Sequence, residues 1–197
     1  MGAVTGPRVR EYQLYLLRTM TDAPSEMIDR ALLSLGSSEE EMETEFEEIS
    51  RLTDIVVPGT NRLAPVFDTI SQILAPVVNK AIRQTEPGET RVNLYSLPMW
   101  PQFLFEVSGT AEGYLEGCRF VRAPGEEPLQ ASNPAQLGAW MATQDEVETL
   151  FGPLQELEVW PPFEAFSLIR SAPDGSPQTY EFVFSWKLLQ SVRLTET

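Results

Sequence analysis

The sequence of 197 residues contains no histidine. Histidine is the commonest general base near neutral pH and the commonest ligand of zinc. Its absence excludes Ser-His-Asp and Cys-His catalysis, HExxH metalloproteases and haem held by a histidine. With one cysteine in addition, structural zinc is excluded too. We therefore expect no metal, no cofactor and no catalytic residue, and we predict that the protein is not an enzyme.

Cysteine is nearly absent as well, and Cys118 cannot form a disulfide within the chain. This excludes the disulfide frameworks of small secreted proteins. Residues 1–13 lack the basic and apolar segments of a signal peptide. No apolar run reaches the roughly 18 residues that a membrane span needs. We expect a cytoplasmic protein, or one within a particle assembled in the cytoplasm, that no signal peptide exports.

Basic residues are scarce: 14 lysines and arginines stand against 29 aspartates and glutamates, and the net charge is −15. A protein that binds the phosphates of a nucleic acid needs clustered basic side chains to displace the counterions of those phosphates. Here the nearest clusters are only pairs, Arg8 with Arg10 and Arg119 with Arg122. We therefore expect no nucleic acid as partner and no binding to an anionic membrane surface.

The N-terminal part predicts mostly helices. Residues 9–20 are aromatic and aliphatic with weak alternation, which favours a strand, with a helix as the alternative. Residues 24–36 predict a helix that Gly36 ends. Ser38 and Glu41 have the spacing of a capping box, which predicts the start of a second helix.

That second helix has one narrow apolar stripe, formed by Met42, Phe46, Ile49 and Leu52. Its other faces are almost entirely glutamate. Runs of one charge usually mark a solvated face, which is our interpretation. The alternative is a surface that binds a basic partner or a cation.

The tetrapeptide Leu-Ala-Pro-Val occurs twice, at Leu63 and at Leu74. The spacing of eleven residues corresponds to 3.67 residues per turn, so both copies would lie on one helix face. Pro76 lacks the N–H that a helix interior needs, which predicts a kinked helix. The alternative, which we favour less, is that residues 63–82 form a helix that lies on a lipid surface.

The C-terminal part is rich in aromatic and β-branched residues and predicts antiparallel strands. One hairpin is expected between residues 103–108 and 114–123, and a second between 166–171 and 179–186. Residues 132–152 predict an inserted pair of short helices, the first starting at Ser132-Asn133-Pro134 and the second at the capping box of Thr143 and Glu146.

These elements predict the α+β class: an N-terminal strand and a helical lobe of about four helices, then a mostly antiparallel β lobe with the inserted helix pair. We place the helical lobe at residues 1–91 and the β lobe at residues 92–197. One compact domain is the alternative.

Two segments combine aromatic residues with proline: "LPMWPQF" at residues 97–103 and "VWPPFEAF" at residues 159–166. Aromatic side chains held by prolines lose little entropy on binding and are typical of interface anchors. The apolar stripe of the acidic helix adds two more candidates. The six interface candidates are Trp100, Phe103, Trp160, Phe163, Met42 and Phe46.

We therefore expect a non-enzymatic structural or adaptor protein that works through protein partners or self-association in a larger assembly. A virion or phage particle is one setting for such a protein. The alternative is a small enzyme or ligand-binding domain that uses Asp and Glu carboxylates in a cleft between the lobes. The 29 acidic residues permit that chemistry but identify no pair.

Overall fold

The computed structural model describes residues 7–53, 66–84, 88–160, 162–172 and 174–195. The chain has the α+β class that the sequence predicts, with two antiparallel sheets of four strands each. It forms two compact units. Unit 1 holds the described residues up to Arg18 and residues 30–123, and unit 2 holds residues 19–29 and 124–195. The boundary expected after residue 91 falls inside strand β2.

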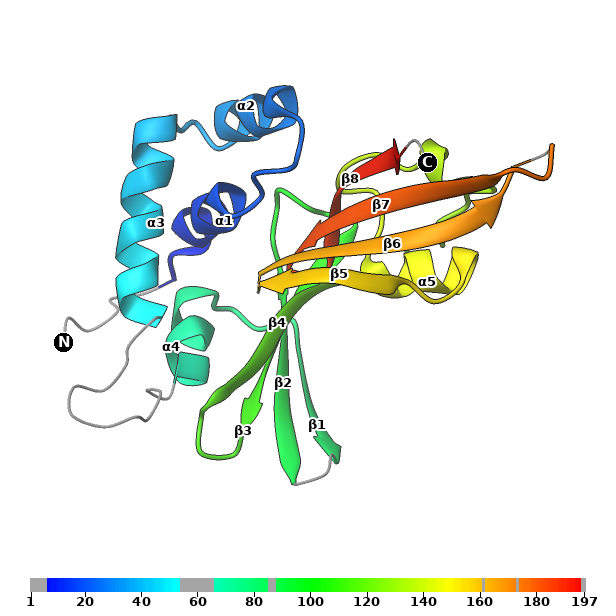
Figure 1. The fold of residues 1–197 in the computed structure, drawn as a ribbon. Coiled ribbons are helices and arrows are strands. Elements are labelled where there is room, and N and C mark those ends of the chain that lie inside the picture. The colour runs from blue at the N-terminus through cyan, green and yellow to red at the C-terminus, as the bar shows by residue number, and fades with distance from the viewer. Residues whose placement is uncertain (1–6, 54–65, 85–87, 161, 173, 196–197) are drawn as a thin grey trace. The chain divides into compact units, whose positions relative to one another are not determined.

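The elements follow one another as Figure 1 shows. The helices are α1 (Val9–Arg18), α2 (Ser25–Ser34), α3 (Glu39–Thr53), α4 (Val66–Ile73), the short 3₁₀ helix η1 (Pro134–Gln136) and α5 (Gln144–Phe151). The strands are β1 (Asn79–Gln84), β2 (Glu89–Ser96), β3 (Phe103–Thr110), β4 (Leu115–Arg122), β5 (Gln155–Trp160), β6 (Phe163–Ser171), β7 (Pro177–Ser185) and β8 (Leu188–Thr195).

The N-terminal strand expected at residues 9–20 is wrong, because this segment forms helix α1. Half of its ten side chains are buried, and they are not confined to one narrow stripe: Tyr12, Gln13, Leu14, Leu16 and Leu17. A helix buried on several sides loses the 3.6-residue pattern that identifies an amphipathic helix. Its sequence therefore resembles a buried strand.

Helix α1 lies beside α3, the glutamate-rich helix (Figure 1). Arg8 binds Glu45 and Glu48 at 2.7 and 2.6 Å. Arg10 forms a bidentate ion pair with Glu41, with N–O distances of 2.7 and 2.9 Å. This corrects the interpretation of the acidic faces as solvated, since part of the acidic surface of α3 binds the arginines of α1.

The kink expected at Pro76 is also wrong. Helix α4 ends at Ile73, and strand β1 begins at Asn79. Between them the Val78 N–H donates to the Leu94 carbonyl of β2, so the chain has already joined the sheet. The second proline stops the helix because it supplies no N–H to continue it. The first copy, up to Pro65, lies outside the described residues.

Helix α4 packs directly on the sheet β1–β4. A Cβ at Gly109 of β3 would lie 2.7 Å from the Phe67 side chain and 2.6 Å from the Tyr114 carbonyl, so this contact requires glycine. Arg91 of β2 lies over the Phe67 ring and binds Asp68 at 2.9 Å. The β3–β4 hairpin is the first one that the sequence predicts.

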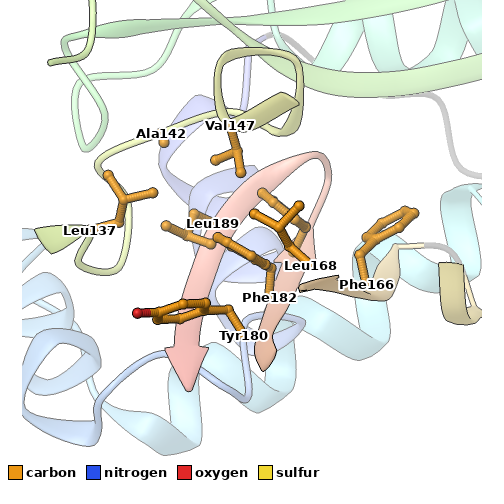
Figure 2. Packing of buried hydrophobic residues seen from close by; sticks show 9 residues of the cluster. Leu137, Ala142, Val147, Phe166, Leu168, Tyr180, Phe182 and Leu189 are labelled. Atoms are coloured by element: carbon orange, nitrogen blue, oxygen red, sulfur yellow. The ribbon is translucent and has the colours of Figure 1, made fainter. Parts of the chain in front are cut away.

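Unit 2 contains the sheet β5–β8, which α5 covers on one face (Figure 1). Figure 2 shows the core between them, where strands β6, β7 and β8 contribute aromatic and aliphatic side chains. The buried cluster consists of Leu137, Ala142, Val147, Phe166, Leu168, Tyr180, Phe182, Phe184 and Leu189. The β6–β7 hairpin is the second one that the sequence predicts.

The inserted helix pair at residues 132–152 is confirmed in its second member only. The Thr143 side chain and Glu146 form the capping box at the start of α5, and Gly152 ends the helix. The first member is reduced to the three residues of η1, which Asn133 caps.

Three glutamates whose pKa arginine contacts lower, Glu41, Glu48 and Glu106, make the stability of the fold depend on pH. Hydrogen bonds from Arg10 and Ser37 hold the pKa of Glu41 at about 2, and Arg8 lowers the pKa of Glu48. Burial alone would raise the pKa of Glu106, but Arg83 and Arg119 together outweigh it and lower the pKa. Glu45 acts in the opposite direction, because burial raises its pKa.

We expect the free energy of unfolding to fall as the pH drops from about 5 towards about 2. A carboxyl group whose pKa is lowered by folding stabilises the fold above its unfolded pKa and loses that effect as the pH falls through its folded pKa. Urea unfolding followed by circular dichroism across this range measures the effect. Glu106→Gln should make the curve shallower, and a variant curve parallel to the wild type would contradict the assignment.

Candidate functional site

Strand β5 is an edge of its sheet and pairs only with β6 among the described residues. All six of its residues are exposed. Three of them are large and apolar: Leu157 is 54% exposed, Val159 37% and Trp160 70%. The register shifts between Glu156 and Glu158, which makes Leu157 the extra residue of a bulge. This strand is the most apolar exposed edge in unit 2.

Strand β5 ends beside the turn that joins β7 to β8. The two turn residues, Trp186 and Lys187, have φ angles of +54° and +61°. A side chain in this left-handed region costs about 1–2 kcal/mol per residue. Turns of this type usually carry glycine or asparagine, so the sequence gives no signal for this one. The surrounding contacts must therefore hold it in place.

Several hydrogen bonds fix this turn. The Trp186 N–H donates to the Pro162 carbonyl at 2.9 Å, which ties the β7–β8 turn to the β5–β6 turn. The Trp186 indole N–H donates to the Thr19 hydroxyl at 2.8 Å. The Gln144 N–H donates to the Lys187 carbonyl at 2.9 Å. These residues form what we call the hairpin end of unit 2.

The hairpin end also holds an ion pair between a buried carboxylate and a partly exposed amine. The Lys187 amine lies 2.7 Å from Oε1 of Glu164, and it donates to the Gln144 side chain at 3.0 Å. Glu164 is buried, and its Oε2 has no hydrogen-bond partner among the described residues. Its neighbour across the sheet is Val159 of β5. The ion pair therefore lies directly behind the exposed edge strand.

The six interface candidates differ in their burial. Trp100, Phe103 and Met42 are buried. Trp100 and Phe103 pack edge-on against Phe120 within unit 1. These three residues are part of the core, so they offer no exposed anchor.

Of the remaining candidates, Phe46 is partly exposed and stacks on Tyr15. Phe163 is partly buried and lies opposite Trp160 in the β5–β6 pair. Trp160 alone of the six is largely exposed. The sequence identified this residue by its aromatic-proline context, but it did not identify the strained turn or the ion pair next to it.

Carboxylates do not converge at the buried positions. Glu106 faces Arg83 and Arg119 at 2.6 and 3.0 Å, and Glu164 faces Lys187. Within the described ranges, no three cysteine, aspartate or glutamate side chains are grouped as metal ligands would be.

Comparison with protein-family models, with curated proteins and with solved structures finds no match to this chain. Among the helices that the structure describes, none has the length and apolar character to cross a membrane.

We expect Lys187→Met to lower the free energy of unfolding by about 1–3 kcal/mol, because Glu164 would keep a buried charge without its partner. Glu164→Gln in the same chain should recover part of the loss. Urea unfolding of the two single variants and the double variant measures the coupling between the residues. Strictly additive effects would show that the ion pair contributes nothing of its own.

Cys118 is predicted to be unreactive. Part of the residue reaches the surface, but burial of the thiol raises its pKa to about 12, and the nearby Glu106 carboxylate adds to the effect. The thiolate is the reactive form, so little of it exists near pH 8. Modification by an aromatic disulfide reagent should be far slower in the native protein than in urea. Equal rates would contradict the prediction.

Proposed function

We propose that this protein is a non-enzymatic structural or adaptor protein that acts through protein–protein contacts, and that strand β5 is its docking edge. The observation that carries the proposal is the exposure of Leu157, Val159 and Trp160 on one strand whose outer edge has no partner strand among the described residues. Single exposed apolar residues are ordinary, but three on one free edge are typical of a surface that a partner covers.

The proposed mode of binding is addition of a strand. An edge strand presents unpaired backbone N–H and C=O groups that an extended segment of another protein can pair with. The backbone bonds supply affinity, and the side chains on either face supply specificity. Trp160 is the natural anchor, because large aromatic residues contribute most at interfaces.

The charges on β5 restrict its partners. In an antiparallel pair of two β5 strands centred on Leu157, Glu156 of each copy would face Glu158 of the other, and like charges that face each other across strands are destabilising. A partner strand with a lysine or arginine among apolar residues would instead gain favourable pairs. The proposed partner is therefore an extended segment that is apolar and basic.

The hairpin end supports the docking edge. The bonds of Trp186, the Lys187–Glu164 pair and the α5 cap fix the strands behind β5. A rigid edge loses little conformational entropy when a partner binds. The strained turn is consistent with this role, since strain of this kind accumulates at functional sites.

The alternative function, a small enzyme or ligand-binding domain, would use two carboxylates that face each other. Both buried glutamates described above face cations instead. The adaptor role is therefore preferred. Membership of a larger assembly, with a virion as one setting, belongs to the same proposal.

Selection of short random peptides displayed on phage tests the docking edge. We expect the enriched peptides to alternate apolar and basic residues and to bind the wild-type protein. Combined Leu157→Ser and Trp160→Ser substitutions should weaken binding about tenfold or more, because an aromatic anchor contributes at least that factor. Fluorescence anisotropy of a labelled peptide measures the affinity.

The matched control is Ile169→Ser on β6, which removes an aliphatic side chain that is 66% exposed but lies off the edge strand. It should leave binding unchanged. The proposal fails if no peptide is enriched, or if the control weakens binding as much as the β5 substitutions do.

A further inference from the structure

Unit 1 has a second edge strand, β1, which is both apolar and basic, as the proposed partner of the docking edge should be. It pairs only with β2 among the described residues, and all six of its residues are exposed. It carries Lys80 and Arg83 and no acidic residue. Ile82 on the strand is 64% exposed, and Val78 just before it is 57% exposed.

We propose that β1 of one copy of this chain pairs with β5 of another, so that the protein assembles head to tail. This inference rests on the proposed function of β5 as a docking edge and names its partner. It follows from the opposite charges of the two free edges and from the spacing of their apolar residues.

The spacing between charged and apolar residues on β1 matches that on β5 whether the two strands run parallel or antiparallel. Residues two apart lie on the same face of a strand. With Lys80 placed opposite Glu158, an antiparallel pairing sets Val78 opposite Trp160. A parallel pairing with the same charge contact sets Ile82 opposite Trp160 instead. In either direction one opposite-charge pair and one apolar contact form on the same face.

The charges also select against the wrong pairings. Two copies of β5 would bring glutamates together, and two copies of β1 would bring basic residues together. Only the mixed pair removes both repulsions. The preference for the mixed pair depends on Lys80, because the other basic residue of β1, Arg83, is already bound to Glu106 at 2.6 Å.

The resulting contact is between different surfaces of the two copies. After a single contact the pair of copies keeps one free β5, on the copy that used its β1, and one free β1, on the copy that used its β5, so further copies can add at both ends. Repetition of this contact gives a closed ring if the rotation between neighbouring copies leads back to the first copy, and an open filament if it does not. Association should weaken as salt is added, because the contact depends on opposite charges at an exposed edge.

Light scattering and sedimentation over a concentration series test the inference with the full chain. We expect the wild-type mass to rise with concentration. Lys80→Glu alone or Glu158→Lys alone should shift the midpoint of association about five- to tenfold upward, because each substitution makes like charges face each other. Both substitutions in one chain exchange the charges of the two edges and should restore association.

Matched controls change charge by the same amount elsewhere: Arg51→Glu at the end of α3 and Glu127→Lys after β4, both exposed. They should associate as the wild type does. The inference is overturned if the wild type stays a monomer at every concentration, or if the double variant associates no better than the single ones. In that case, peptides that still bind β5 would leave the docking edge standing and exclude only the second copy as its partner.

Discussion

The burial of helix α1 is the constraint on which unit 1 depends. Tyr12 packs edge-on against Phe105 of β3, the Gln13 side chain accepts the Met99 N–H, and the Arg8 N–H bonds to the last residue of α4. The same helix presents arginines to α3. Arg8 and the helix that follows it thus contact the sheet and two other helices, and the buried surface of α1 helps to fix how these elements are arranged around it.

The ion pairs between α1 and α3 explain why an acidic helix is stable here. Seven glutamates on α3 would repel one another in isolation. Arg8, Arg10 and Arg18 offset that repulsion at Glu45, Glu48, Glu41 and Glu43. These pairs are partly exposed and individually weak, so their main effect is to set which face of α3 meets α1 while the apolar stripe supplies the burial.

The sequence predicts elements well where one residue decides the geometry and poorly where packing decides it. The capping box at Thr143, the stop at Gly36 and both predicted hairpins depend on local turn chemistry, and the structure has them. Helix α1 depends on burial from several sides, which its own residues cannot reveal. The β7–β8 turn uses tryptophan and lysine where turn chemistry favours glycine, so only its distant contacts account for it. Of the interface candidates, Trp160 was identifiable from its prolines, but the burial of Trp100 was not.

The state of Cys118 has a practical consequence for studying the molecule. Its thiol stays protonated across the range in which maleimides react, and no other cysteine exists in the chain. Cysteine-directed labels can therefore be attached at introduced cysteines without first replacing Cys118. Cysteines introduced on exposed positions of β1 and β5 can carry fluorophores or spin labels while the native residue, and the strand that it belongs to, are left untouched.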